Sequence, residues 1–305
     1  MLDLEGLHLR AALFRSIRNF FSGQHFLEVD TPVRQPVMIP ESNIEPIQAE
    51  SWFLQTSPEQ CMKRLLGQGA ERIFQLSPCF RKGESGRKHL EEFTMLEWYR
   101  AGSDYLDLMD DCQNLVRYVT DDLSAQKKFK PILGKSCLQE MDLQQRWQRM
   151  SVEEAFAAFC SMSAGEALSK NLFDEMMVAY IEPELGTSCP LFLYDYPVQC
   201  GSLARRKKGE PTVVERFEMY INGLELANGF SELTDVEEQR LRFDQEITQI
   251  KVMHGRDVQM PERFLDDLVL IDSAAGIALG VDRLLMLIMS RESIDEVVPF
   301  SPGDW

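Results

Sequence analysis

Residues 216–228, RFEMYINGLELAN, indicate how the chain folds. At their centre, the dipeptide Asn222-Gly223 separates two runs of strand-like composition. Both residues readily adopt the positive φ of a type I′ turn, so this dipeptide is a strong signal for a two-residue β-hairpin. The stretch therefore predicts two antiparallel strands joined by a tight turn.

Two acids of this hairpin are expected on one face. The turn pairs Tyr220 with Glu225 and Glu218 with Ala227, and side chains alternate along each strand. Glu218 and Glu225 thus become diagonal neighbours, about 7–8 Å apart, which long side chains can bridge. Two carboxylates in one cleft repel unless a cation lies between them, and Mg²⁺ favours such hard oxygen ligands. The hairpin predicts either a Mg²⁺ site or a solvent-facing acidic strand face.

Further strands and separate helices flank the hairpin in the sequence. Strand patterns cover residues 72–81, 92–99, 191–196 and 276–280. Helical patterns are found in four places: before Gly23, over residues 106–123, after a capping box of Thr234 and Glu237, and from Arg283 onward. This order predicts an α+β fold with an antiparallel β-sheet flanked by helices, rather than a doubly wound parallel sheet. We expect one domain over residues 1–305, with a less regular helical segment at residues 124–190. Within this segment, a capping box of Ser151 and Glu154 marks the start of a short helix.

The composition excludes several classes of protein. A chain of 305 residues with 44% hydrophobic residues can bury a core and is not disordered. The net charge of −17 excludes a general nucleic-acid-binding surface. Seven cysteines without a C-x-x-C spacing are typical of reduced thiols in a cytoplasmic protein. We expect no membrane span, because no apolar run is long enough, and no export signal, because Asp3 and Glu5 make the first residues acidic.

Cations gather in one loop of this acidic chain. Residues 81–89 contain two arginines, two lysines and a histidine, and the strand that follows places Phe93, Met95, Glu97 and Tyr99 on one face. Cations can hold phosphates and an aromatic ring can stack on a base, so the segment suits a bound nucleotide. An ordinary charged hairpin loop would show the same composition. Near the C-terminus, Gly276 and Gly280 indicate close backbone packing.

Taken in order, these segments resemble the catalytic core of the class II aminoacyl-tRNA synthetases. Residues 26–32 (FLEVDTP) resemble motif 1, and residues 80–97, from FR to EFTMLE, resemble motif 2. Residues 276–283 (GIALGVDR) resemble motif 3, and residues 56–59 (TSPE) lie between the first two motifs. Each motif is degenerate by itself, but their combination in this order is specific. The resemblance implies an ATP-dependent ligase with the catalytic fold of this class.

Residues 225–233 (ELANGFSEL) are similar to the segment that seats the substrate in lysyl-tRNA synthetases. The resemblance implies that Glu232 receives the ε-ammonium of lysine and that Tyr99 assists. A buried ammonium needs a carboxylate partner, and a neutral amino acid would leave that carboxylate unpaired. The resemblance therefore implies a substrate of the lysine type.

Three features differ from a tRNA-charging enzyme. The first helix begins within ten residues of Met1, which leaves no room for an anticodon-binding barrel before motif 1, and the acidic composition lacks the surface that tRNA requires. Ala278 stands where the tRNA enzymes usually have glycine. In these respects the chain resembles the branch of the family that attaches (R)-β-lysine to translation elongation factor P. The alternatives are a stand-alone lysyl-tRNA synthetase catalytic domain and a non-catalytic paralogue that acts as a binding module.

The resemblance also implies the roles of individual residues. The catalytic set is Arg81, Glu225 and Arg283. The ATP-binding set is Arg81, Lys82, Gly83, Glu84, His89, Phe93, Glu225, Leu226, Gly280 and Arg283. The set for lysine or (R)-β-lysine is Ser57, Pro58, Glu59, Tyr99, Glu232 and Ala278, and Glu218 and Glu225 hold Mg²⁺. We further expect elongation factor P as the protein substrate, no tRNA, a cytoplasmic location, and a homodimer formed through motif 1 and the phenylalanines of the first helix, Phe14, Phe20 and Phe21.

Overall fold

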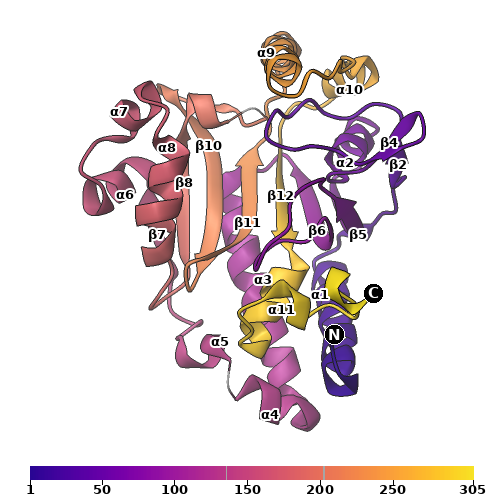
Figure 1. Cartoon of the computed structure of the whole chain (residues 1–305), viewed down its shortest axis with the longest axis vertical. Coiled ribbons are helices and arrows are strands. Elements are labelled where there is room, and N and C mark those ends of the chain that lie inside the picture. Colours follow the sequence, from indigo (N-terminus) through magenta and orange to yellow (C-terminus); the bar gives the residue numbers. More distant parts are fainter. Residues whose placement is uncertain (135, 202) are drawn as a thin grey trace.

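The computed structural model describes residues 1–134, 136–201 and 203–305, and its centre is a mixed β-sheet (Figure 1). The described residues form a nine-stranded sheet and a separate three-stranded sheet. The spatial order of the large sheet is β1 (Leu27–Glu28), β5 (Arg72–Phe80), β6 (Glu92–Ala101), β12 (Ala274–Gly280), β11 (Leu224–Ser231), β10 (Glu210–Ile221), β8 (Leu191–Pro197) and β7 (Gln148–Ser151), with β9 (Arg206–Lys207) paired to β10. The small sheet contains β2 (Arg34–Gln35), β4 (Trp52–Leu54) and β3 (Gln48–Ala49).

The predicted α+β class is confirmed, and the sheet is antiparallel through its middle. At its two edges the sheet also contains parallel pairs, because β1 pairs with β5 and β7 pairs with β8 in parallel. Each of these pairs is joined by a long connection, and parallel neighbours require such a connection. The central strands β6, β12, β11 and β10 are antiparallel to their neighbours and carry the residues expected at the site.

The predicted hairpin is present, but its register differs from the prediction beyond Tyr220. Asn222 and Gly223 have φ values of 53° and 66°, and Tyr220 pairs with Glu225, as a type I′ turn requires. A β-bulge then adds one residue to β11, so Glu218 pairs with Asn228 and not with Ala227. A bulge sets two residues against one and re-aims the side chains that follow it.

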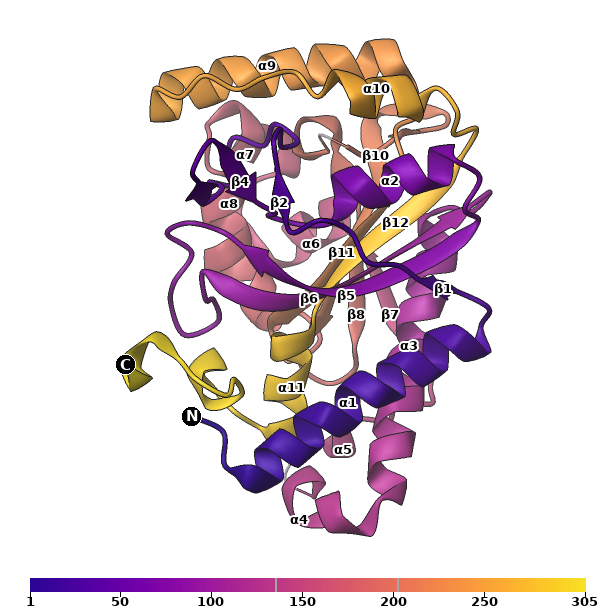
Figure 2. The same cartoon turned by 90° about the vertical axis from the view of Figure 1, so that its right-hand side faces the viewer.

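Helices pack on the sheet in separate groups (Figures 1 and 2). One group consists of α1 (Leu4–Gly23), α3 (Tyr105–Ala125) and α11 (Val281–Met289), and another of α2 (Glu59–Gly67), α9 (Val236–His254) and α10 (Glu262–Leu268). The first group buries Phe20 and Phe21 with Trp98 of β6, and Phe14 packs against this cluster. These phenylalanines therefore contribute to the core of their own chain. Across the described residues, none of the helices combines the length and the apolar character that crossing a bilayer requires.

Two helix starts differ from the sequence predictions. The N-cap of α9 is Asp235, whose Oδ1 accepts the backbone N–H of Glu238 at 3.0 Å, so the expected capping box of Thr234 and Glu237 is wrong. Helix α11 begins at Val281, two residues before the predicted start. Arg283 therefore lies within the first turn of α11, directly beyond the end of β12.

Residues 124–190 contain short helices, and they also contain one strand, β7, that the sequence pattern did not predict. Helices α4 (Lys130–Leu133) and α5 (Cys137–Glu140) precede β7, and α6 (Val152–Phe159), α7 (Ala164–Ser169) and α8 (Phe173–Met176) follow it. The capping box at the start of α6 is confirmed: Ser151 Oγ accepts the N–H of Glu154 at 3.2 Å, and Glu154 Oε2 accepts the N–H of Ser151 at 2.7 Å. Helices α6, α7 and α8 form a second hydrophobic cluster with β8 and β10, and the pairing of β7 with β8 extends the sheet.

Candidate active site

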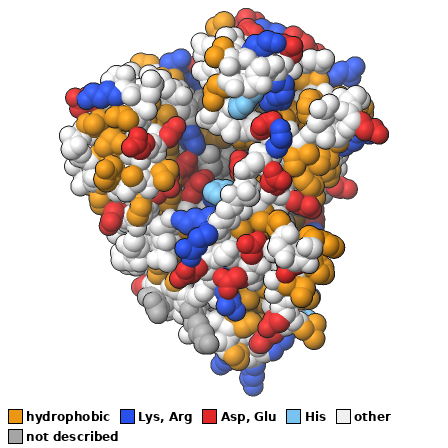
Figure 3. Space-filling model, viewed as in Figure 1, with side chains coloured by type: hydrophobic (Ala, Val, Ile, Leu, Met, Phe, Trp, Pro, Cys, Tyr) orange, Lys and Arg blue, Asp and Glu red, His pale blue; other side chains and the backbone are white. Residues whose placement is uncertain are grey.

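One large cavity of about 870 Å³ lies over β6, β11 and β12. The space-filling view shows a hollow near the middle of the molecule, with acidic and basic side chains at its rim (Figure 3). Its walls also include residues 41–44, parts of the loop between β5 and β6, and residues from 168 to 174. The cavity therefore brings together segments from the whole length of the chain.

Strand alternation places one face of β6 in this cavity. Phe93, Met95, Glu97 and Tyr99 all line it, as the sequence predicted for this face. Opposite Tyr99 on β12 lies Gly276. A Cβ atom at this position would collide with the Tyr99 ring and with Glu232 Oε1. Glycine is thus required here because the Tyr99 ring and the Glu232 carboxylate occupy the space of a side chain.

A buried ion network forms one end of the cavity. Lys63 Nζ lies 2.5 Å from Glu59 Oε1 and 2.5 Å from Glu232 Oε2, and the Lys63 and Glu232 side chains are 2% and 1% exposed. Burial raises the pKa of Glu232 to about 8, and the Lys63 charge opposes this shift. Burial disfavours the Lys63 ammonium, but Glu232 and Glu59 outweigh it and raise the Lys63 pKa. The ammonium of Lys63 therefore keeps two buried carboxylates together.

A third carboxylate, Glu97, adjoins this network. The Tyr99 hydroxyl donates a hydrogen bond to Glu97 Oε1 at 2.5 Å. Burial raises the pKa of Glu97 well above its usual value, and the Glu59 charge adds to the shift. Within the described parts of the chain, Glu97 Oε2 and Glu232 Oε1 are buried and have no hydrogen-bond partner. Buried polar atoms are rarely left unsatisfied, so this end of the cavity is suited to a ligand that donates hydrogen bonds, such as an ammonium.

Arg81 lies toward the opposite end of the cavity. Its guanidinium lies over the Phe93 ring, 5.3 Å from the ring centre, and its Nη1 atom is 3.8 Å from Glu84 Oε2. The Arg81 side chain is 25% exposed and lines the cavity together with Ser57 and Glu59. This guanidinium is held loosely enough to bind an anionic ligand, for which its planar donors are well suited.

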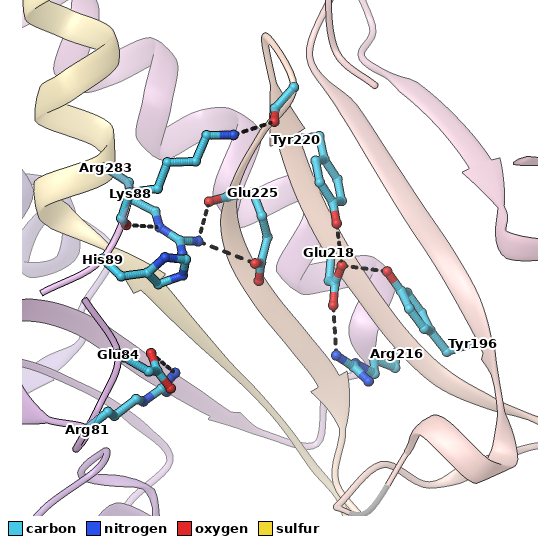
Figure 4. Close-up of polar contacts among 11 residues, drawn as sticks. Arg81, Glu84, Lys88, His89, Tyr196, Arg216, Glu218, Tyr220, Glu225 and Arg283 are labelled. Carbon is cyan, nitrogen blue, oxygen red and sulfur yellow. Dashed lines mark hydrogen bonds and ion pairs between the residues drawn. The ribbon is translucent and has the colours of Figure 1, made fainter. Parts of the chain in front are cut away.

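Arg283 connects three parts of the site (Figure 4). Its Nη1 atom donates to the Glu225 backbone oxygen at 2.8 Å and lies 3.3 Å from Glu225 Oε2. Its Nη2 atom is 2.6 Å from His89 Nε2, and its Nε atom donates to the Lys88 oxygen at 3.3 Å. Burial lowers the pKa of His89, and the Arg283 charge lowers it further, so the imidazole is neutral and accepts this hydrogen bond. The loop between β5 and β6, strand β11 and helix α11 therefore meet at one guanidinium.

Glu218 is held in a polar network beside Glu225 (Figure 4). Its Oε2 atom accepts hydrogen bonds from the hydroxyls of Tyr196 at 2.6 Å and Tyr220 at 2.7 Å, and its Oε1 atom lies 2.7 Å from Arg216 Nη2. Burial raises the pKa of Glu225 to about 7, and the Glu218 charge adds to this effect. The pair is therefore a crowded acidic site that a cation would relieve.

The chemistry of these oxygens fits Mg²⁺ bound together with a nucleotide. The described residues contain no group of three or more His, Cys, Asp or Glu side chains arranged to hold a metal ion. Mg²⁺ often uses only one or two carboxylates and takes its other ligands from phosphates and water. Glu225, which faces the cavity, is the better placed of the two acids, because the carboxylate of Glu218 is already bound by Arg216 and the hydroxyls of two tyrosines.

Most of the predicted site residues come together in the cavity. Those that line it are Ser57, Glu59, Arg81, Glu84, His89, Phe93, Tyr99, Glu225, Leu226, Ala278, Gly280 and Arg283. Glu232 and Glu218 lie behind its wall, where they contact Lys63 and Arg216. Lys82 instead pairs with Glu45 at 2.6 Å, and its side chain is 58% exposed. Pro58 and Gly83 are likewise outside the described lining of the cavity.

Sequence reasoning missed four residues that shape the site. Lys63 lies four residues after Glu59 on α2, and this spacing was a readable local signal for an ion pair. Glu97 shares a strand face with Tyr99, and alternation along the predicted strand was a readable signal that its carboxylate belongs to the site. Arg216 lies two residues before Glu218 on β10, and alternation along a strand was a readable signal that both side chains share a face. Tyr196 offered no signal, because its contact with Glu218 depends on the pairing of β8 with β10.

Comparison with known proteins agrees with this geometry. The family model described as "tRNA synthetases class II (D, K and N)" matches residues 4–303. Two relatives carry the name elongation factor P–(R)-β-lysine ligase. The protein of Avibacterium paragallinarum is 37% identical, over 98% of this chain and 96% of the relative. That of Proteus mirabilis (strain HI4320) is 36% identical, over 98% and 95%. The chain therefore belongs to the class II tRNA synthetase family (D, K and N).

Proposed function

We propose that the protein uses ATP to activate lysine or (R)-β-lysine as an acyl-adenylate and transfers the aminoacyl group to a lysine side chain of elongation factor P. One observation carries the first half of this proposal. A single cavity contains buried, unsatisfied carboxylate oxygens at one end and the guanidiniums of Arg81 and Arg283 at the other. This polarity matches a substrate with an ammonium at one end and a carboxylate that must meet a triphosphate at the other.

In the first step, a carboxylate oxygen of the amino acid attacks the α-phosphorus of ATP. The new P–O bond forms as the bond to the pyrophosphate oxygen breaks, and pyrophosphate leaves. Arg81 binds both the α-phosphate and the attacking carboxylate, while Arg283 and His89 bind the distal phosphates and the adenine edge. Phe93 stacks on the base. No protein nucleophile is needed, because positioning and charge neutralisation account for catalysis of this kind.

Glu225, with Glu218 behind it, would hold Mg²⁺, which when bound supplies neutralising charge to the phosphates. Arg216 and the hydroxyls of Tyr196 and Tyr220 fix the carboxylate of Glu218. The charge of Glu218 raises the pKa of the neighbouring Glu225, and a bound cation would relieve this repulsion. At the amino-acid end, Ser57, Glu59, Tyr99 and Glu232 orient the substrate, and Glu97 joins them.

In the second step, a neutral lysine amine of elongation factor P attacks the carbonyl carbon of the adenylate. An amide bond forms, the bond to AMP breaks, and the amine gives up a proton. The names of the relatives support elongation factor P as the acceptor. The net charge of −17 supports a protein acceptor over tRNA, because tRNA binding relies on many cations. We propose a homodimer that works in the cytoplasm, where translation factors are found.

An acceptor assay tests the whole proposal. The chain is incubated with ATP, Mg²⁺ and labelled lysine or (R)-β-lysine, and with either elongation factor P or tRNA. We expect label and the matching mass increase on elongation factor P alone. Label on tRNA would instead identify a stand-alone lysyl-tRNA synthetase domain. Absence of lysine-dependent pyrophosphate exchange would identify a binding module and contradict the proposal.

A further inference from the structure

One carboxylate in the cavity has no role in the site described so far. Glu41 lines the cavity together with Ser57, Glu59 and Arg81. It lies in the segment between β2 and β3, outside the motifs that carry the family resemblance. A carboxylate facing a cavity is costly unless something in the cavity compensates for its charge.

The segment around Glu41 is held firmly in place. The Ser42 N–H donates to Glu246 Oε2 at 2.7 Å, and Ser42 Oγ donates to Gln249 Oε1 at 3.1 Å. His254 Nε2 lies 3.0 Å from the Ser42 oxygen. Three residues of α9 thus fix the residue next to Glu41, so its carboxylate is presented by a rigid support and not by a loose loop.

The charges near Glu41 compensate it only in part. Burial raises its pKa to about 7, and the negative charges of Glu59 and Glu246 raise it further. Arg81 and Lys63 oppose this shift, but Lys63 pairs directly with Glu59 and Glu232. In the parts of the chain that the structure describes, the Glu41 carboxylate has no hydrogen bond or ion pair of its own.

The proposed substrates carry two ammonium groups. One is at the end of the substrate's side chain, and the other is one or two carbons from the carboxylate that reacts. The far ammonium is matched by Glu97 and Glu232. The near ammonium must lie close to the group that binds the reacting carboxylate, which is Arg81. Glu59 already shares its Oε1 atom with Lys63, so its capacity for a second cation is reduced.

We infer that Glu41 binds the second ammonium of the substrate, the one near the reacting carboxylate, and so selects diamino acids over acids that have only the terminal amine. This inference rests on the proposed function, and it adds a specificity-determining residue to that site. The position of Glu41 beside Arg81 and Glu59 in one cavity carries it.

Binding measurements with three ligands test the inference without depending on catalysis. Isothermal titration gives the Kd of lysine, (R)-β-lysine and 6-aminohexanoic acid, which lacks the second amine, for the wild-type chain and for Glu41→Gln. We expect Glu41→Gln to raise the Kd of the better-bound lysine isomer by about 10- to 100-fold, which is the effect of losing a close, partly desolvated charge pair. Binding of 6-aminohexanoic acid should change less than twofold.

Two further variants make the result decisive. Glu41→Asp keeps the charge and should retain most of the preference, and Glu50→Gln, at an exposed position between β3 and β4, should behave as wild type. If Glu41→Gln weakens the binding of all three ligands equally, or of none, the inference is overturned. The proposed function then still stands, provided that the wild type shows lysine-dependent pyrophosphate exchange. Absence of that exchange in the wild type would instead overturn the proposed function, and failure of the wild type to bind any of the ligands would overturn both.

Discussion

The two ends of the cavity compensate their charges in different ways. At one end, Glu232 and Lys63 are almost fully buried, and the chain supplies its own cation. At the other end, the ion pairs are more open to solvent: the side chains of Arg81 and Glu84 are 25% and 31% exposed, and those of Arg283 and Glu225 are 18% and 37% exposed. Buried charges interact strongly and allow few arrangements, whereas exposed pairs are weak and exchange readily. The buried end therefore suits selection of one ammonium ligand, and the open end suits phosphates that enter and leave in every cycle.

Removing the internal cation should have the largest effect. Lys63→Met leaves Glu59 and Glu232 without a partner in a buried site, which typically costs about 3–5 kcal/mol. We expect a loss of this size in the free energy of unfolding, measured by urea denaturation at pH 7. Lys63→Arg keeps the charge and should lose much less. Equal stability of wild type and Lys63→Met would show that the network contributes nothing to the buried end.

At the open end, loss of a guanidinium should affect catalysis more than stability. Arg81→Ala and Arg283→Ala should each lower pyrophosphate exchange more than 10²-fold, about 3 kcal/mol of transition-state stabilisation. Thermal unfolding of the two variants should stay close to that of the wild type. Near-normal exchange in both variants would contradict the assignment of this end to the nucleotide.

Gly276→Ala tests how closely the buried end is packed. The added methyl group meets the Tyr99 ring and Glu232 Oε1, and overpacking of this kind typically costs about 1–3 kcal/mol. We expect a lower free energy of unfolding and a raised KM for lysine in the exchange assay, while the KM for ATP is unchanged. A change in the KM for ATP alone would show that Gly276 lies beside the nucleotide and not beside the amino acid.

The pH dependence of stability distinguishes Glu225 from exposed acids. Its pKa rises from 4.5 to about 7 on folding, so between these values the folded chain holds a proton that the unfolded chain has released. The free energy of unfolding therefore falls as the pH rises through this window. Glu225→Gln removes this contribution, and we expect a shallower fall between pH 5 and pH 7 in urea titrations. Glu292→Gln, which replaces an exposed acid, should keep the wild-type slope.

The smallest effect is expected at the exposed ion pair. Arg87 Nη2 lies 2.5 Å from Glu292 Oε2, but exposed pairs typically contribute about 0–1 kcal/mol. Arg87→Ala should therefore alter the free energy of unfolding by less than about 1 kcal/mol, and it should leave pyrophosphate exchange near the wild-type rate. It serves as the matched control for Arg81→Ala. A large loss of exchange in Arg87→Ala would mean that the open end extends further toward solvent.

The residues that sequence reasoning placed correctly depend on local periodicity. Phe93 and Tyr99 share a face because side chains alternate along any strand, and Asn222-Gly223 forms its turn without help from the rest of the chain. The residue opposite Glu218 could not be predicted, because the bulge is decided by packing against neighbouring strands. Lys63 and Glu232 meet only after α2 and the end of β11 are brought together by the fold.

The bulge also restricts which changes of length the chain can accept. It gives β11 one residue more than the matching part of β10, and this surplus sets which side chains beyond the turn face the cavity. Deleting one residue from this part of β11, or inserting one into β10, would turn every later side chain to the opposite face. We therefore expect insertions and deletions among relatives to avoid residues 218–228, and to occur instead in longer connections such as residues 255–261 between α9 and α10.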